Sequence, residues 1–218
     1  PGEVSLAHDG VLFLDELPEY RRDALEALRQ PMEDGIVCIS RVKGKYIYPS
    51  RFMLIASMNP CPCGYYGYQL KECRCSEMQI RNYLNKVSGP LLDRIDLHIS
   101  IEPVKFDEIN DNTSGESSKD IRKRVECARA IQMERFKNEN ILYNSQMKGR
   151  QIKKYCKVEK DGLKLLENAY RNLALSTRAY NKILKISRTI ADMEGTENIS
   201  EKHIAEAIQY RVLDRKYW

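Results

Sequence analysis

Residues 10–20 read GVLFLDELPEY, a stretch in which an apolar run ends at two adjacent acids. The run VLFL at 11–14 comes directly before Asp15 and Glu16. Continuous apolar runs of this length are typical of strands that are buried in parallel sheets. Two interpretations are open: the acids begin a helix or loop, or they bind a ligand at the carboxyl end of a strand, where open α/β sheets bind ligands.

The composition describes a globular protein. The chain has 218 residues, 42% hydrophobic and 31% charged, enough for one large or two small domains. No apolar run approaches the roughly 18 residues of a membrane span, and the N-terminus does not resemble a signal peptide. Because an initiating Met is absent, we expect a fragment of a longer protein. Seven cysteines without secretory features predict a reducing, cytoplasmic location, with thiols that pack or bind metal.

Charge is distributed unevenly along the chain. Residues 1–118 carry 13 Lys and Arg against 18 Asp and Glu, a net −5, whereas residues 119–218 carry 23 against 13, a net +10. A basic half permits a polyanionic partner such as a nucleotide or nucleic acid. The alternative is a set of basic helices that are merely solvated.

A polar segment divides the chain into two parts. Residues 107–119 read DEINDNTSGESSK, and we place a linker at 107–120. Before it, residues 1–106 contain the apolar runs VLFL, FMLIASMN and DLHISI, which predict buried parallel strands, and a predicted amphipathic helix at 21–29.

After the linker, residues 121–218 predict an all-helical domain. Ile183, Ile186 and Ile190 share one helical face, and Ser176 and Ser200 are suited to cap the last two helices. The predicted fold class is therefore α/β followed by all-α.

The acid pair suits nucleotide chemistry. In P-loop enzymes an acid at the end of a strand holds the Mg²⁺ of a nucleoside triphosphate, and a second polar group orients the attacking water. Asp15 is the candidate metal ligand and Glu16 the candidate base.

Three further polar residues follow in an order that chance seldom produces. Asn59 ends the run FMLIASMN, and its amide is a candidate contact for the terminal phosphate or the attacking water. Arg94, in SGPLLDRID, precedes the predicted third strand and is a candidate for stabilising phosphoryl charge in a neighbouring subunit. Arg178, in LSTRAY, lies in the first turn of a predicted helix. Taken singly, each of them is equally compatible with a surface or packing role.

The strings GVLFLDELPE, LIASMNPCPCG, SGPLLDRIDLHI and LSTRAYNKILKISRTIAD resemble the AAA+ ATPases of the ComM/YifB group, also called magnesium-chelatase-like proteins. The resemblance covers essentially the whole chain. It implies that Asp15 and Glu16 form the Walker B motif, with Asn59 as sensor 1, Arg94 as the arginine finger and Arg178 as sensor 2. It also implies the C-terminal part of an AAA+ core followed by a helical lid, in a hexameric homo-oligomer that hydrolyses ATP with Mg²⁺. The best-understood members resemble translocases of branched DNA that act in natural transformation.

One departure from the family bears on activity. The phosphate-cradling loop G-x-x-x-x-G-K-[ST] does not occur in these 218 residues, whose only Gly-Lys pair, Gly44-Lys45, is followed by Tyr46. We therefore expect this chain alone to hydrolyse no ATP.

Residues 35–51, GIVCISRVKGKYIYPSR, predict a β-hairpin with Arg41, Lys43 and Lys45 around its tip. The resemblance implies the pre-sensor 1 hairpin, which projects into the pore of related rings. Three cations there suit a phosphate backbone. The alternative is a solvated basic tip.

Four cysteines form the most unusual feature. Cys61 and Cys63 lie in NPCPCGYYG, and Cys73 and Cys75 lie in KECRCSE, within a predicted insert at 60–76. Four thiolates suit a structural Zn²⁺, although C-x-C pairs depart from the commoner C-x₂₋₄-C spacing. Reduced free thiols and disulfides are the alternatives. The remaining cysteines are isolated and are interpreted as packing residues: Cys38, Cys127 and Cys156.

Two other functions remain open. One is the motor subunit of a magnesium chelatase, which as a family lacks the cysteine insert. The other is a non-catalytic, zinc-stabilised adaptor. Such a protein would not need all five candidate site residues, Asp15, Glu16, Asn59, Arg94 and Arg178. The histidines lack ligand spacing, and His98 is predicted on the polar face of the third strand.

Overall fold

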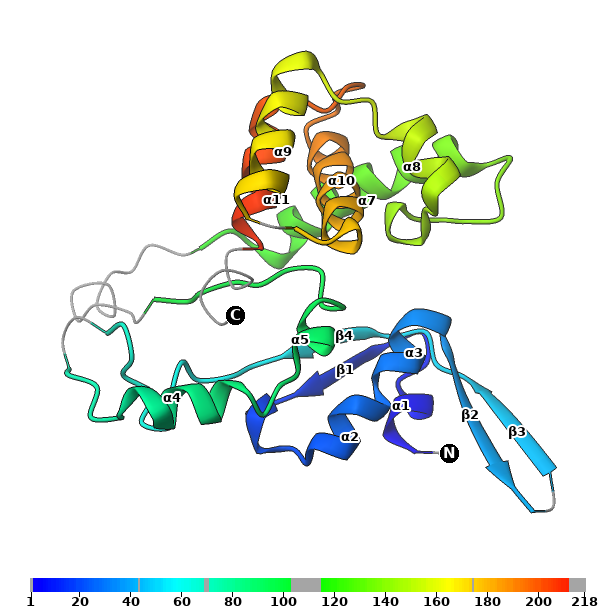
Figure 1. The fold of residues 1–218 in the computed structure, drawn as a ribbon. Coiled ribbons are helices and arrows are strands. Elements are labelled where there is room, and N and C mark those ends of the chain that lie inside the picture. The colour runs from blue at the N-terminus through cyan, green and yellow to red at the C-terminus, as the bar shows by residue number, and fades with distance from the viewer. Residues whose placement is uncertain (1, 43, 69–70, 103–114, 174, 212–218) are drawn as a thin grey trace. The chain divides into compact units, whose positions relative to one another are not determined.

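The computed structural model describes residues 2–42, 44–68, 71–102, 115–173 and 175–211 (Figure 1). The chain forms two compact units, an α/β unit that ends at Ile95 and a helical unit that begins at Asp96. The predicted linker at 107–120 begins later than this division, and residues 103–114 lie outside the described residues. No helix in the described ranges combines the length and apolar character needed to span a membrane.

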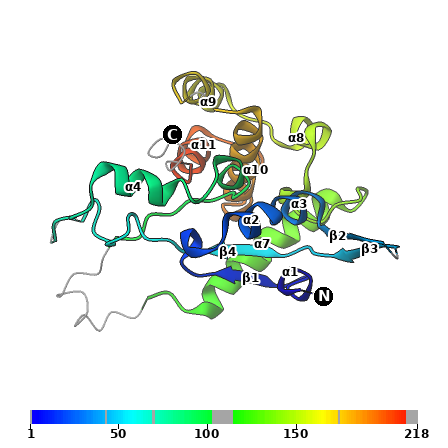
Figure 2. The ribbon, with the colours of Figure 1, turned by 60° about the horizontal axis from the view of Figure 1, so that its bottom comes forward.

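The α/β unit contains two small sheets and several short helices. Its elements are α1 (Glu3–Leu6), β1 (Val11–Leu14), η1 (Leu17–Glu19), α2 (Arg22–Ala27), α3 (Arg29–Asp34), β2 (Ile36–Arg41), β3 (Gly44–Pro49), β4 (Met53–Ala56), α4 (Glu77–Leu84) and α5 (Gly89–Leu92). β1 and β4 pair in parallel, with Val11 opposite Met53 and Leu14 opposite Ala56. β2 and β3 form an antiparallel hairpin, which extends away from the rest of its unit (Figures 1 and 2). The hairpin and the parallel strands predicted at VLFL and FMLIASMN are therefore confirmed.

The core of this unit lies on one face of the parallel pair. Leu12 and Leu14 pack against a buried cluster contributed by η1, α2, the segment before α5, and α5 itself: Leu17, Leu25, Leu28, Val87, Leu91 and Leu92. The opposite face is exposed, with Val11 at 55% and Phe13 at 59%. The expectation of a buried strand at VLFL therefore holds for one face only in the described residues, whose helices leave the other face uncovered.

Two other local predictions are also wrong. The predicted helix at 21–29 is divided at Leu28 into α2 and α3. Pro31 explains the division, since proline lacks an N–H and is tolerated only in the first turn of a helix. The predicted third strand, DLHISI, has no strand within the described residues. His98 is buried and does not lie on a polar strand face. Its backbone N–H donates to the Tyr210 carbonyl at 2.8 Å.

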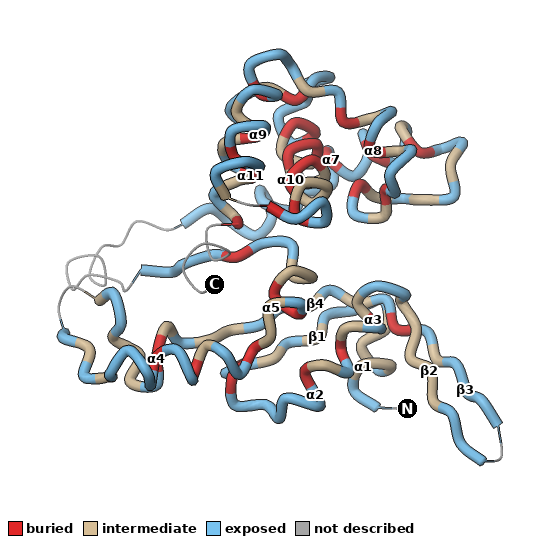
Figure 3. Tube along the Cα trace, in the orientation of Figure 1, coloured by how far each residue is buried: buried red, intermediate tan, exposed pale blue. Residues whose placement is uncertain are grey.

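The helical unit consists of α7 (Ser118–Phe136), η2 (Asn144–Gln146), α8 (Gly149–Tyr155), α9 (Lys160–Asn172), α10 (Thr177–Met193) and α11 (Glu201–Gln209). Buried residues concentrate on α10, which contacts α7, α8 and α11 (Figure 3). Ser176 caps α10 by accepting a hydrogen bond from the Ala179 N–H at 3.0 Å. Ser200 precedes α11, as predicted.

A buried charged network crosses this core. Asp192, 2% exposed, accepts hydrogen bonds from Arg188 Nε at 3.0 Å, from Arg135 Nη1 at 2.7 Å and from Asn144 Nδ2 at 2.8 Å. The Arg188 guanidinium also donates to the carbonyls of Thr196 and Glu197. Because α7, η2, α10 and the segment after α10 all contribute, Asp192 joins elements that are distant in sequence.

Replacing Asp192 with Ala should lower the free energy of unfolding by about 3–5 kcal/mol, because it leaves buried arginines without a counter-charge. Urea denaturation followed by circular dichroism measures the change. Asp161→Ala is the matched control, since Asp161 pairs with Lys164 on the surface, where the side chains are 70% and 65% exposed. Equal effects of the two substitutions would contradict this account.

Candidate functional site

The two acids lie at the carboxyl end of the parallel pair. β4 runs beside β1, so Ser57 comes next to Asp15, one residue beyond each strand. The Ser57 hydroxyl donates to Asp15 Oδ1, and the Glu16 N–H contacts both Asp15 Oδ1 at 3.1 Å and Ser57 Oγ at 3.3 Å. The Leu17 N–H also donates to the Ser57 carbonyl at 2.8 Å. Ser57 therefore orients the acid pair, a role that the sequence interpretation missed.

Glu16 has an unusual backbone conformation. Its φ of 51° and ψ of 51° lie in the left-handed region, which costs most L-residues about 1–2 kcal/mol. The chain turns there from β1 into η1, leaving both carboxylates exposed. Such conformations persist only where the surrounding structure holds them in place, and they cluster at functional sites.

Asn59 lies three residues beyond β4, at the same end of the parallel pair as the acids. It is exposed, and its backbone lies next to the hydroxyl of Tyr83 on α4. Tyr83 is 7% exposed, and this burial raises the pKa of its phenol. The sequence interpretation missed Tyr83, since nothing in the spacing of the apolar residues of α4 indicates a contact with Asn59.

Arg94 has a different environment. Its guanidinium donates to Glu33 Oε2 at 2.8 Å and to the Pro90 carbonyl at 2.6 Å, and its side chain is 9% exposed. Glu33, on α3, is a second partner that the sequence did not indicate. Arg178 is exposed in the first turn of α10 and belongs to the helical unit.

The hairpin presents its side chains on two faces. The paired residues Val37 and Tyr48, Ile39 and Tyr46, and Arg41 and Gly44 share one face, whereas Ser40 and Lys45 lie on the other. Arg41 and Lys45 are both exposed, and Lys43 lies outside the described residues. The face with Arg41 also carries Tyr46, which is 48% exposed.

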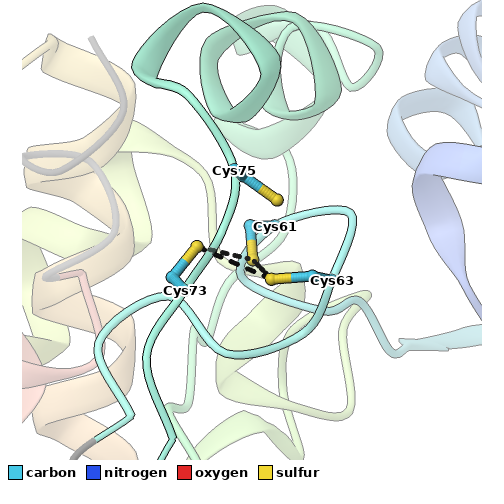
Figure 4. A group of neighbouring side chains, drawn as sticks. All are labelled: Cys61, Cys63, Cys73 and Cys75. Atoms are coloured by element: carbon cyan, nitrogen blue, oxygen red, sulfur yellow. Dashed lines mark hydrogen bonds between the residues drawn. The ribbon is translucent and has the colours of Figure 1, made fainter.

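The four cysteines of the predicted insert come together. Cys61 and Cys63 lie on the loop after β4, and Cys73 and Cys75 lie on the segment before α4 (Figure 4). The sulfur of Cys61 lies 3.4 Å from that of Cys63 and 3.7 Å from that of Cys73, and Cys63 and Cys73 are 3.6 Å apart. All four sulfurs lie within 4.8 Å of one another.

These separations suit a tetrahedral metal ion. Four sulfurs at about 2.3 Å from a central Zn²⁺ are about 3.8 Å apart. The Tyr66 N–H donates to Cys61 Sγ at 3.4 Å, and backbone hydrogen bonds from Tyr65 and Arg74 lower the pKa of Cys63 to about 6. Backbone donors directed at sulfur stabilise thiolates, the form that binds metal.

Comparison with known proteins identifies the family of the chain. The family model described as magnesium chelatase, subunit ChlI, matches residues 1–109, and the model of its C-terminal region matches residues 115–211. The chain belongs to the magnesium-chelatase-like family. It is 46% identical over 216 residues to the uncharacterised protein YifB of Salmonella typhimurium, and 47% identical over 216 residues to the competence protein ComM of Haemophilus influenzae. These matches cover 99% of the chain but only 42% and 41% of the relatives, respectively.

A more distant match extends to another group. The zygotic DNA replication licensing factor mcm6 of Xenopus tropicalis is 21% identical over 225 residues, covering 98% of the chain and 25% of mcm6. The magnesium-chelatase-like family is AAA+ ATPase-like, which agrees with an α/β unit followed by a helical one. The resemblance to the ComM/YifB group is therefore confirmed, while the roles of the individual residues stay predictions.

Replacing Glu16 with Gly should give a more stable protein than replacing it with Ala, by about 1 kcal/mol, because glycine adopts the left-handed region without a Cβ clash. Both substitutions remove the same carboxylate, so the comparison isolates the backbone. Chemical denaturation of the two variants measures the difference. An Ala variant as stable as the Gly variant would show that the backbone at position 16 is unstrained.

Proposed function

We propose that the chain is part of an ATP-hydrolysing motor that moves DNA, of the ComM branch-migration type. The arrangement of Asp15, Glu16 and Asn59 at one end of the β1–β4 pair carries this proposal. Two carboxylates and an amide there suit a magnesium nucleotide, because the carboxyl ends of parallel strands are where open α/β sheets bind ligands.

The proposed roles follow from the chemistry of each group. Asp15 would hold Mg²⁺, which neutralises phosphate charge, and Glu16 would accept a proton from the attacking water. Asn59 would orient that water or the terminal phosphate. Arg178 would contribute positive charge from the helical unit.

Arg94 would act on the nucleotide of a neighbouring subunit in a hexameric homo-oligomer. The Arg94 guanidinium is held by Glu33 and the Pro90 carbonyl in the described chain. To reach a neighbour's phosphate it would exchange Glu33 for that anion. Such exchange suits an arginine finger, whose charge is needed only in the assembled site.

The hairpin would contact the DNA backbone through Arg41, Lys43 and Lys45, in a cytoplasmic ring. The presence of Arg41 and Lys45 on opposite faces suits a strand that passes around the tip, and Tyr46 beside Arg41 offers a stacking surface. The similarity to a DNA replication licensing factor, mcm6, and to the competence protein ComM supports a DNA-directed role.

We also propose that the cysteine cluster holds a structural Zn²⁺ through Cys61, Cys63, Cys73 and Cys75. The sulfur separations support this assignment, and four protein ligands leave no open position for catalysis.

A second candidate is the motor subunit of a magnesium chelatase. The descriptions of the two matching family models favour it. It would share the ATP site but would show no stimulation by DNA, so the same assay distinguishes the two.

The intact protein should hydrolyse ATP, and Glu16→Gln should reduce turnover about 100-fold or more while nucleotide binding is kept, because the amide cannot accept the proton. The chain of residues 1–218 alone should show no turnover above that of its own Glu16→Gln variant. Steady-state phosphate release, with and without single-stranded and branched DNA, measures both effects. Turnover by the isolated chain well above that of its Glu16→Gln variant would contradict the expectation that hydrolysis also needs a phosphate-cradling loop, which these 218 residues lack.

Arg41→Ala and Lys45→Ala in the intact protein should each reduce DNA-stimulated ATPase more than basal ATPase. Each should also lower the slope of log affinity against log salt by about 1, because one phosphate contact is lost. Lys164→Ala removes an equal charge from the surface of the helical unit and is the control. Equal losses of basal and stimulated activity would indicate a folding role for the hairpin instead.

A further inference from the structure

The cysteine cluster and Asn59 belong to one continuous loop system. β4 ends at Ala56, Asn59 follows three residues later, and Cys61 follows two residues after Asn59. On the far side of the loop, Cys75 directly precedes Ser76, the N-cap of α4. The cluster therefore joins the chain immediately after Asn59 to the start of α4.

α4 then returns to Asn59. Tyr83, near the end of this helix, is buried with its hydroxyl next to the Asn59 backbone, and Lys86, two residues after the helix, donates to Glu19 Oε1 of η1 at 3.2 Å. Ser76 and Gln79 form a capping box, with the Gln79 N–H donating to Ser76 Oγ at 3.3 Å and the Ser76 N–H donating to Gln79 Oε1 at 2.9 Å, which fixes where the helix begins. The segment from Asn59 to Lys86 is thus closed at two places, the cysteine cluster and the end of α4, which is tied to η1.

The described residues between the cysteine pairs make local contacts with one another: the Tyr65 and Tyr68 rings lie 5.9 Å apart, and Lys71 Nζ lies 4.0 Å from the Tyr65 ring centroid. Cys61 is fully buried, whereas Tyr66, Gly67 and Lys71 are exposed. Gly64 and Gly67, both at a φ of 82°, reverse the chain but add no side chains to a core. Thiol groups alone form weak hydrogen bonds, so four reduced thiols would offset little of the conformational entropy lost on ordering this loop.

We propose that Zn²⁺ bound by the four cysteines positions Asn59, by anchoring α4 and Tyr83 against the end of β4. The metal is structural, and Asn59 is the functional group that it places. The role of Asn59 in ATP hydrolysis rests on the function proposed above. The positioning of Asn59 by the metal does not depend on that function.

The first test is metal content. The chain prepared under reducing conditions should contain one Zn²⁺, as should Cys127→Ser, which removes an exposed cysteine on α7. Cys75→Ser should lose the metal, and Cys75→His should retain it, because imidazole replaces thiolate as a zinc ligand. Absence of zinc from the unaltered chain, or full occupancy in Cys75→Ser, would overturn the proposal.

Hydrogen exchange tests the positioning. In Cys75→Ser, amide exchange should become about tenfold faster at 57–61 and 77–84, through easier local opening, while the β2–β3 hairpin and α10 stay unchanged. Cys75→His and Cys127→Ser should exchange like the unaltered chain. Metal loss without faster exchange at 57–61 would overturn the proposal, and so would faster exchange throughout the α/β unit, because the metal would then hold the whole unit.

The consequence for catalysis is tested in the intact protein. Cys75→Ser and Asn59→Ala should each lower kcat with little change in the KM for ATP, and the double variant should be no slower than Asn59→Ala alone. Multiplying losses would show that the metal acts independently of Asn59. If the intact protein hydrolyses no ATP at all, the proposed function fails, while the zinc and exchange measurements still decide the positioning.

Discussion

The parallel pairing of β1 with β4 is the constraint on which the rest of the α/β unit depends. It places Asp15 next to Ser57, and it brings Asn59 to the same end of the sheet. A shift of one residue in this register would turn Leu12 and Leu14 away from the core and separate the acid pair from Ser57. The packing of one face and the geometry of the acids are therefore set by the same backbone hydrogen bonds.

Strain and anchoring act together at this end of the sheet. The left-handed backbone at Glu16 is held by the contacts of Ser57, while the loop after Asn59 would be held by the metal ion that we propose for the cysteine cluster. Catalytic groups must be kept close to their working geometry by neighbours that are themselves fixed. Arg94 differs, because its charge is already paired with Glu33 in the described residues.

Local signals in the sequence were sufficient for β1, β4, the hairpin and the residues that precede α10 and α11. Their failures have physical causes: Pro31 divided a predicted helix, and the alternation in DLHISI was not matched by a pairing strand, which left His98 buried beside Tyr210. Cys127, interpreted as a packing residue, is exposed on α7. Periodicity also gave no sign of Ser57, Tyr83 or Glu33, because their roles come from contacts between segments that lie 24 to 61 residues apart.

The most direct test of the central claim is a structure of the intact protein in the Glu16→Gln form with ATP and Mg²⁺. The account predicts that Mg²⁺ lies at the Asp15 carboxylate, with the terminal phosphate next to Asn59 and Arg94 of the adjacent subunit directed at the same phosphate. A nucleotide bound away from the carboxyl end of β1 and β4 would contradict the account, and these acids would then be surface groups at the end of a strand.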